Sequence, residues 1–326
     1  MSDLTNNLIS ILADGEFHSG EELGERLSVT RTAIWKQIQK LSEWSLVIES
    51  IKGRGYRIAG GLELLDKAKI ENSISEKNHS LISKLEILQA VDSTNTLAKQ
   101  HAERGNASGL VVLAERQTAG RGRRGRTWVS PFARNIYLSV VWGFDGGAAS
   151  LEGLSLAVGV AVKRAVETCG LKGVSLKWPN DVLVGQSKLG GILLEMTGDP
   201  AGFCQVVVGV GLNVAMPMEG AEEITQRWTD LQKAGGNTLS RNEVASVLLN
   251  ELLALLDDYQ SVGFEKYREE WQASDAFKDQ SVKLVTPNQE VTGIARGVAE
   301  NGALRLEVGG EVRSFNGGEI SLRGAG

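Results

Sequence analysis

The feature that most constrains this chain is the segment Gly120-Arg-Gly-Arg-Arg-Gly-Arg126, which places four arginines within six residues. From Arg116 to Gly143 the chain holds six basic residues and no acidic residue. Glycines weaken helices and strands, and arginines are rarely buried without a partner, so the segment predicts an exposed loop. Neighbouring guanidinium groups repel one another, and an anionic partner would order them. We therefore expect backbone N–H groups to close around an anion while the arginines bind carboxylate or phosphate.

Other interpretations of this loop carry less weight. The spacing Gly120-x-Gly122-x-x-Gly125 matches the dinucleotide-binding fingerprint, but that motif needs a helix to begin at the loop, and Pro131 follows closely. The GxxxxGK[ST] phosphate-binding pattern does not occur in the sequence. The remaining alternative is a solvated flexible loop, which is what most runs of charge are.

Composition and charge exclude several broad classes of protein. Hydrophobic residues make up 42% of the 326 residues and charged residues 23%, which are globular values and argue against disorder. The formal net charge of −5 argues against a general nucleic-acid coat, so any contact with DNA must come from a local basic surface. Two cysteines exclude a disulfide framework and a Cys-rich zinc site. The three histidines lie far apart, and we expect no metal held by the protein alone.

Charge divides the first 60 residues in two, with six acids and no base among the first 25, then seven bases and two acids. Ser19 and Glu22 form a capping box that begins one helix, and Thr30 can cap a second. Two short apolar strands around Lys52-Gly-Arg-Gly55 predict a hairpin. A helix-turn-helix followed by a basic hairpin predicts a winged helix.

The second helix of this motif would enter a major groove, and the hairpin would meet phosphate. The outward-facing residues that we expect to contact DNA are Arg31, Thr32, Trp35, Lys36 and Gln39 on the helix and Arg54 on the hairpin. The alternative is a small helical adaptor that binds protein, because a solvated basic helix face is common. The charge segregation and the basic hairpin together favour DNA as the partner.

Strands and helices intermix between about residue 85 and residue 214, which predicts an α+β region with a sheet and with helices covering one face. The expected strands are Leu85–Val91, Leu110–Ala114, Ile136–Trp142, Val174–Lys177, Leu189–Met196 and Cys204–Leu212, and the expected helices are Thr94–Arg104, Leu151–Cys169 and, further on, Ser240–Gln260.

After Gln280 no helix is apparent, and short strands alternate with turn signals such as Pro287-Asn288 and Gly309-Gly310. This pattern predicts a small β-barrel. We therefore divide the chain into three parts, 1–62, 63–278 and 279–326. The sequence shows no signal peptide and no apolar stretch that could span a bilayer, so we expect a cytoplasmic protein with no membrane partner.

Three further motifs place polar groups where a ligand could lie over strand ends. Asp92-Ser-Thr-Asn95 joins a strand to a helix, and its short polar side chains could face a ligand, although Ser93 or Thr94 alone is a routine helix cap. In Gly209-Val-Gly-Leu-Asn213, the glycines permit close approach and Asn213 could bind phosphate or a hydrated metal; the alternative is a glycine-weakened strand end.

The third motif is Lys177-Trp-Pro-Asn-Asp181, in which Trp178-Pro179 is stiff and fixes where Asn180 and Asp181 point. A hairpin turn after it would bring Lys188 back near this segment. Taken alone, Lys188 is a strand-edge lysine that discourages aggregation.

No nucleophile constellation is apparent, because no Ser/His pair is suggested and both cysteines lie in apolar runs. The inventory of cations suits chemistry that joins two anions without a covalent enzyme intermediate. Nucleotide activation of a carboxylate fits, since Lys and Arg can neutralise both partners and then stabilise the developing charge.

Together these motifs resemble the family of bifunctional biotin protein ligases that are also biotin operon repressors. The resemblance covers nearly the whole chain, and the arginine-glycine loop with the Lys177–Asp181 motif is a highly specific pair. It implies a central biotin/lipoate ligase-type mixed sheet and a C-terminal SH3-like barrel. It also implies two half-reactions, in which biotin and MgATP give biotinyl-5′-adenylate, and the biotinyl group then passes to a lysine of the biotin carboxyl carrier domain of acetyl-CoA carboxylase.

The resemblance also implies roles for individual residues. The expected biotin contacts are Ser93, Thr94, Asn95, Gln117, Arg121, Gly122, Arg123 and Lys188. The expected nucleotide contacts are Trp128, Lys177, Asn180, Asn213 and, as a covering residue near the segment 216–228, Trp228. Lys188 and Arg123 would act in catalysis, and Asp181 would orient or deprotonate the incoming lysine.

Finally, the resemblance implies a switch, in which the adenylate orders the glycine-rich loops, a homodimer forms and two winged helices then occupy two half-sites. Two alternative functions remain open from sequence. One is a lipoate ligase-like acyl transferase, which shares the fold, and the other is a non-catalytic regulator that senses a ligand and binds DNA.

Overall fold

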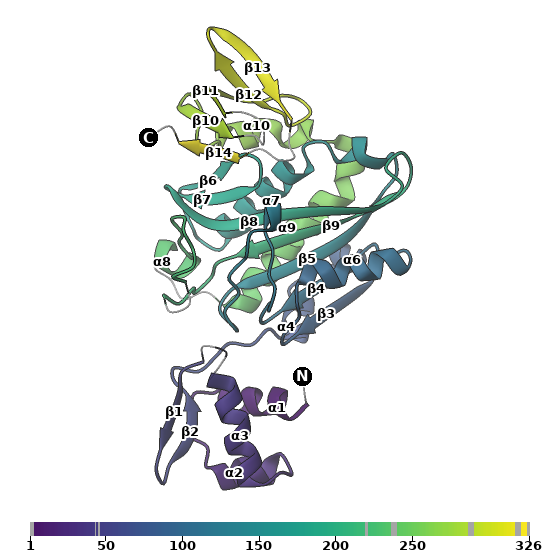
Figure 1. Cartoon of the computed structure of the whole chain (residues 1–326). Coiled ribbons are helices and arrows are strands. Elements are labelled where there is room, and N and C mark those ends of the chain that lie inside the picture. Colours follow the sequence, from purple (N-terminus) through teal and green to yellow (C-terminus); the bar gives the residue numbers. More distant parts are fainter. Residues whose placement is uncertain are drawn as a thin grey trace.

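The computed structural model describes residues 3–42, 44, 46–218, 221–235, 240–285, 290–316 and 321–324. The chain forms three parts in sequence order, with a central sheet lying between an N-terminal helical part and a C-terminal sheet (Figure 1). The predicted fold class is confirmed, with a winged helix, a mixed central sheet and a C-terminal antiparallel sheet. Among the described residues, no helix is both long and apolar enough to cross a bilayer.

The N-terminal part is the predicted winged helix, made of α1 (Asp3–Leu12), α2 (Gly20–Arg26), α3 (Arg31–Ser42) and the antiparallel hairpin β1 (Ile48–Ile51) and β2 (Gly55–Ile58). Ser19 caps α2 by accepting a hydrogen bond from the Glu22 amide at 3.0 Å, which is one half of the predicted capping box. The Glu22 side chain bonds to His18 and Arg26 instead of reaching back to the cap. Leu8, Leu23 and Ile34 are fully buried at its centre. Their burial orients α3 so that its polar face remains outside.

The central sheet has seven strands in the order β3-β4-β5-β9-β8-β7-β6. Their bounds are β3 (Lys84–Leu88), β4 (Leu110–Ala114), β5 (Ile136–Phe144), β6 (Val174–Lys177), β7 (Asp181–Val184), β8 (Ser187–Gly198) and β9 (Cys204–Leu212). Only the β3–β4 pair is parallel, and the other described pairs of this sheet are antiparallel. In this order β5, β9 and β8 lie side by side, so the sheet brings together residues from distant parts of the chain.

Helices cover both faces of this sheet, so the expectation of helices on a single face is wrong. Alternate residues of β4 point to opposite faces, and Val111 packs in one hydrophobic cluster while Val112 packs in another. The larger cluster holds α7 (Leu154–Thr168) and α9 (Arg241–Val262), and the smaller holds α6 (Thr94–Arg104). Sequence patterning located α6 but could not tell which face it would cover.

The remaining elements connect the parts or complete the C-terminal sheet. The short helices are α4 (Lys67–Asn72), α5 (Glu76–His79), η1 (Arg123–Gly125), η2 (Gly147–Leu151), α8 (Leu231–Gly235) and α10 (Glu265–Ala273). The C-terminal strands are β10 (Ser281–Val285), β11 (Glu290–Val298), β12 (Leu304–Val308), β13 (Glu311–Phe315) and β14 (Ser321–Gly324), in the antiparallel order β13-β12-β11-β10-β14. The predicted turn at Pro287-Asn288 lies outside the described residues.

The winged helix is packed against the central part through an aromatic contact. The rings of Trp44 and Phe132 lie 5.2 Å apart, and Phe132 belongs to the same buried cluster as the winged-helix core. The Arg116 guanidinium lies 5.6 Å from the Trp44 ring centroid. Because Arg116 and Phe132 flank the arginine-glycine loop in sequence, the winged helix contacts the segment that carries that loop.

Candidate active site

A cavity of about 820 Å³ lies over β5, β8 and β9 and under the arginine-glycine loop. Twelve of the fourteen residues that sequence analysis assigns to ligand binding or catalysis line it. They are Ser93, Thr94, Asn95, Gln117, Arg121, Gly122, Arg123, Trp128, Lys177, Asn180, Asp181 and Lys188. These residues come from four separate stretches of the sequence, and the fold brings them together.

The other two assigned residues lie beside the cavity rather than in its lining. The Asn213 side chain is buried, and its amide donates to the Thr229 carbonyl at 3.0 Å. The Trp228 ring contacts the Lys233 ammonium, which lies 4.0 Å from the ring centroid. Asn213 therefore holds a neighbouring segment in this state, and Trp228 packs outside the cavity.

One end of the cavity carries small polar groups at the start of α6. Ser93 occupies the cap position of α6 but makes no side-chain cap hydrogen bond, and only 3% of it is exposed. The Thr94 amide donates to Gln117 Oε1 at 2.9 Å, and Gln117 Nε2 donates to Ser130 Oγ at 3.3 Å. These bonds fix the Gln117 amide, so Thr94 and Gln117 present defined donors and acceptors, and the Ser93 hydroxyl beside them is not used as a helix cap.

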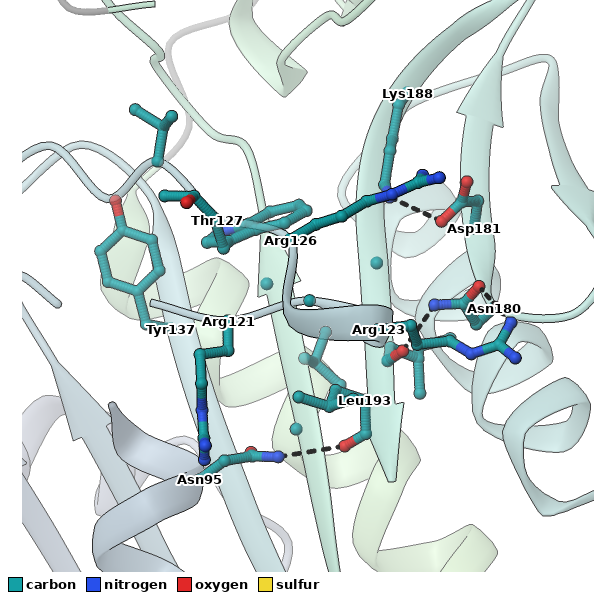
Figure 2. Close-up of a pocket in the computed structure, with 18 of the residues that line it drawn as sticks. Asn95, Arg121, Arg123, Arg126, Thr127, Tyr137, Asn180, Asp181, Lys188 and Leu193 are labelled. Atoms are coloured by element: carbon teal, nitrogen blue, oxygen red, sulfur yellow. Dashed lines mark hydrogen bonds and ion pairs between the residues drawn. The ribbon is translucent and has the colours of Figure 1, made fainter. Parts of the chain in front are cut away.

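Asn95 is held by protein groups on both sides of its amide. Its Nδ2 donates to the Leu193 carbonyl at 3.2 Å and to Glu195 Oε2 at 3.0 Å, and its Oδ1 accepts from Ser139 Oγ at 2.6 Å (Figure 2). Ser139 is fully buried in β5 and also lies 2.8 Å from Thr94 Oγ1. Sequence analysis missed Ser139, although a serine inside an apolar strand was a usable signal because buried hydroxyls need partners.

The opposite end of the cavity gathers cations around one carboxylate. Lys188 Nζ lies 2.6 Å from Asp181 Oδ1, and Lys177 Nζ lies 3.8 Å from Asp181 Oδ2. Figure 2 shows Arg126 extending across the cavity toward Lys188 and Asp181. The hairpin of β7 and β8 thus brings Lys188 to the Lys177–Asp181 motif, as predicted. Arg126 also lines the cavity and was not assigned from the sequence.

The arginine-glycine loop folds over the cavity. The Gly122 amide donates to the Arg126 carbonyl at 2.7 Å, and Arg124 adopts a left-handed conformation with φ of 57°. Arg121 donates to Thr96 Oγ1 at 2.8 Å, and Arg123 donates to Asn180 Oδ1 at 3.4 Å. The loop therefore crosses from α6 to the Lys177–Asp181 motif.

Burial lowers the pKa of the Arg123 guanidinium, and the attraction of Asp181 only partly offsets this while Arg124 and Arg126 add repulsion. Arginine remains charged under all ordinary conditions. A partly desolvated guanidinium with like charges beside it gains most from an anionic ligand.

Two glycines in β9 make room for two of the side chains in the cavity. A Cβ at Gly209 would lie 2.1 Å from Asn95 Oδ1, and a Cβ at Gly211 would lie 2.5 Å from the Trp128 ring. The Trp128 indole N–H is buried without a hydrogen-bond partner, and Lys188 Nζ lies 5.4 Å from the ring centroid. These glycines are therefore required by close approach, and an unpaired donor remains for a ligand.

The arrangement suits positioning and charge neutralisation. Neither Cys169 nor Cys204 lines the cavity, and burial raises the pKa of the Cys169 thiol to about 11. Within the described residues, no group of three His, Cys, Asp or Glu side chains could hold a metal ion. A cavity with a polar end and a strongly cationic end can hold a polar head group at one side and two anionic groups side by side at the other.

A separate surface carries the residues expected to meet DNA. Arg31, Thr32, Trp35, Lys36 and Gln39 are all exposed on α3, and half of the Trp35 side chain is accessible. Arg54 is exposed in the β1–β2 turn, with its guanidinium 4.2 Å from the Phe17 ring centroid. The predicted helix face and hairpin tip are both presented to solvent.

Three family models match the chain. Residues 5–57 match an HTH domain, residues 87–213 match the biotin/lipoate A/B protein ligase family, and residues 279–323 match the biotin protein ligase C-terminal domain. The match to the ligase family begins in β3 and ends at Asn213, which spans the polar and cationic ends of the cavity.

Full-length relatives and solved structures agree with these models. The chain is 42% identical to the bifunctional ligase/repressor BirA of Salmonella typhimurium, over 98% of this chain and 97% of that protein. It is 36% identical to the biotin–[acetyl-CoA-carboxylase] ligase of Mycobacterium tuberculosis, over 72% of this chain and 88% of that protein. The structure of the Aquifex aeolicus biotin protein ligase in complex with biotin and ATP superposes with a TM-score of 0.65 at 30% identity, and the match covers 75% of this chain and all of that one.

Proposed function

The chain belongs to the biotin/lipoate A/B protein ligase family, as a biotin protein ligase with an N-terminal repressor-type HTH domain, and from this membership we propose how its residues activate biotin, transfer it and couple it to DNA binding. The observation that carries the proposal is the cavity itself, which joins a rigid polar end to a cluster of lysine and arginine side chains.

The polar end holds the biotin head group. Thr94 and Gln117 offer hydroxyl and amide groups whose directions are fixed by hydrogen bonds to each other and to Ser130, and Ser93 adds a buried hydroxyl. Asn95 supports this end through Ser139 and Glu195, and the Arg121 guanidinium lies 3.5 Å from the same Glu195 carboxylate. A fixed amide favours a ureido ring, which needs donors and acceptors at defined positions.

The cationic end holds the biotin carboxylate and the α-phosphate of ATP. Lys188 and Arg123 lie there and would neutralise both groups, so that the carboxylate oxygen can attack phosphorus and pyrophosphate can leave. Asp181 accepts from Lys188 at 2.6 Å, which orients the ammonium. We therefore assign Asp181 the orienting role rather than that of a base.

The nucleotide lies beside Trp128, whose unpaired indole N–H is available to a phosphate or base. Lys177 and Asn180 flank this position in the cavity. Mg²⁺ fits as a nucleotide-bound cation, because it takes oxygen ligands from phosphates and water and the lining supplies mostly cations. It would neutralise phosphate charge. Asn180 and, after movement of its segment, Asn213 are the amide groups near the phosphates.

The second half-reaction transfers the biotinyl group to a protein lysine. We propose that the acceptor is the biotin carboxyl carrier domain of acetyl-CoA carboxylase, since the Mycobacterium tuberculosis relative carries that carboxylase in its name. The lysine amine attacks the acyl carbon of the adenylate, the acyl–phosphate bond breaks and AMP leaves. Because ATP and DNA are its proposed ligands, we propose that the protein acts in the cytoplasm.

The DNA-binding half of the proposal uses α3 and the β1–β2 hairpin on operator half-sites, with two chains paired as a homodimer. An open sheet edge supports the pairing. β7 pairs with β8 only as far as Gly191, and Ile192 bonds to Asn180, so within the described part of the chain Leu194–Gly198 has a strand partner, β9, on one side only. Met196 and Phe203 are exposed there. Adenylate would order the arginine-glycine loop and so favour the dimer.

The test is ATP–pyrophosphate exchange with biotin or lipoate, followed by mass analysis of the species bound to the protein. Biotin-dependent exchange and a bound biotinyl-adenylate support the proposal. Exchange with lipoate instead would identify a lipoate ligase, and ligand binding without any exchange would identify a non-catalytic sensor.

A further inference from the structure

A short segment after β9 lines the cavity. The residues just before and just after it both contact one lysine outside the cavity. Residues 221–227, which we term the covering segment, include Glu223, Ile224, Thr225 and Gln226 in the cavity lining. The Met216 backbone precedes the segment and the Trp228 ring follows it. Lys233 in α8 contacts both.

The Lys233 ammonium makes three strong contacts at once. It donates to the Met216 carbonyl at 3.1 Å, lies 4.0 Å from the Trp228 ring centroid and lies 3.0 Å from Asp230 Oδ2. Only 1% of Asp230 is exposed, and its other carboxylate oxygen accepts from the Lys233 amide at 2.7 Å. Asp230 therefore fixes the cation, and the cation links Met216, which precedes the covering segment, to Trp228, which follows it.

The later end of the covering segment is also attached to Lys188. The Lys188 amide donates to the Arg227 carbonyl at 3.0 Å, and the Thr229 amide donates to the Lys188 carbonyl at 2.9 Å. The side chain of Lys188 pairs with Asp181 inside the cavity. These backbone bonds join the later end of the covering segment to the residue proposed to hold the two anions.

We propose that Lys233 is a positioning residue that binds Met216 and Trp228 on either side of the covering segment. It thereby holds the segment over the cavity, as a clamp, and sets how long the adenylate stays bound. This role builds on the proposed ligase function. Lys233 lies outside the cavity lining, so it acts on the ligand only through residues 216 and 221–228. Biotin at the polar end lies away from these contacts, whereas the nucleotide part lies at the end that the segment covers.

The experiment compares Lys233→Gln and Lys233→Arg in the full chain. Labelled adenylate is formed from biotin and ATP, and its dissociation is followed after dilution into unlabelled adenylate. Lys233→Gln is expected to release adenylate about tenfold faster, equivalent to about 1.4 kcal/mol. Its affinity for biotin alone should be unchanged, and Lys233→Arg should restore slow release because arginine keeps a cation for Asp230 and Trp228.

The matched control is Lys266→Gln, which removes a lysine of similar side-chain exposure, 47% against 46%, that also pairs with a carboxylate and lies 5.9 Å from a tyrosine ring. It should release adenylate as the wild type does. Unchanged release from Lys233→Gln would overturn the clamp, and so would an equal loss of affinity for biotin alone.

A second measurement does not depend on catalysis. Trypsin cleavage after the exposed Arg227 is followed by mass spectrometry in the ligand-free protein, and Lys233→Gln should be cut faster at that bond. If the wild type forms no adenylate, the ligase proposal is refuted. Faster cleavage of Lys233→Gln would then still show that Lys233 holds the covering segment in place. Equal cleavage rates would count against the clamp itself.

Discussion

Lys188 Nζ lies 2.6 Å from Asp181 Oδ1, with the lysine at the start of β8 and the aspartate at the start of β7. The two strands pair antiparallel, and the hairpin brings these side chains together although seven positions separate them. The carboxylate points the ammonium into the cavity, where Arg123 and Lys177 also lie. This pair is the centre of the site proposed for the biotin carboxylate and the α-phosphate.

Replacing Lys188 with alanine should abolish adenylation. Loss of one preorganised donor to developing charge typically costs about 100- to 1,000-fold in rate, and Lys188 faces two anions. The measurement is biotin-dependent pyrophosphate release. Lys163→Ala is the control, because Lys163 pairs with Glu167 on the surface of α7. Pyrophosphate release near the wild-type rate in Lys188→Ala would refute the assigned role.

Arg123→Ala should leave the fold intact but make the adenylate leak from the cavity. A hydrogen bond to a charged group contributes about 1.5–3 kcal/mol, which predicts roughly 10- to 100-fold faster dissociation. The measurement is the dissociation rate of biotinyl-adenylate, with Arg104→Ala at the exposed end of α6 as the control. An unchanged rate would show that the loop does not hold the ligand.

Gly209→Ala and Gly211→Ala should separate the two ends of the cavity. The first places a methyl group against Asn95 at the polar end, and the second places one against the Trp128 ring. We expect Gly209→Ala to weaken biotin binding and Gly211→Ala to weaken nucleotide binding, with each variant serving as the control for the other. Calorimetry with biotin and with ATP checks this, and identical effects of both variants on both ligands would contradict it.

Lys36→Ala should weaken operator binding while biotin transfer continues. Loss of one phosphate contact should reduce the slope of log affinity against log salt by about 1. Binding titrations at several salt concentrations give that slope. A point substitution is a cleaner test than removing residues 1–60, because removal would expose the buried Phe132 beside the arginine-glycine loop. Unchanged binding across the salt series would place the DNA contact elsewhere.

The stability of the winged helix should depend on pH through His18. Burial alone would lower the pKa of His18, but hydrogen bonds to Glu22 and Asp14, both at 2.9 Å, raise it above its ordinary value of 6.5. The hydrogen bond from His18 is the main cause that lowers the pKa of Glu22. A raised histidine pKa means stability that is complete below 6.5 and lost as pH rises through the folded-state value.

His18→Gln tests this dependence in the full chain. The difference in unfolding free energy between wild type and variant should be largest near pH 6 and shrink toward alkaline pH. It should also shrink in strong acid, where Glu22 becomes protonated. Chemical denaturation over a pH series measures the difference, and a difference that stays constant from pH 6 to pH 9 would contradict the assignment.

Local sequence signals predicted much of the fold. The bounds of β4, β6, β9 and α6 match the expected ranges, because β4 and β9 are apolar runs, β6 alternates apolar and polar residues, and α6 ends at Gly105. The predictions missed β7, which has four residues between two turns, and α10, in which only Tyr267 and Trp271 are buried. Short elements of this kind carry too little periodicity and are stabilised by their neighbours rather than by their own sequence.

The amino-acid sequence by itself determined which side chains could do the chemistry, because motif spacing and residue type depend only on local order. It identified the arginine-glycine loop, the Lys177–Asp181 motif and the basic face of α3. The tertiary structure decided which groups meet, since it joins β5 to β9 and β8 to β9 across long stretches of chain. That pairing placed Ser139 behind Asn95 and Lys233 across the ends of the covering segment, and distances between such residues depend on packing that no local pattern encodes.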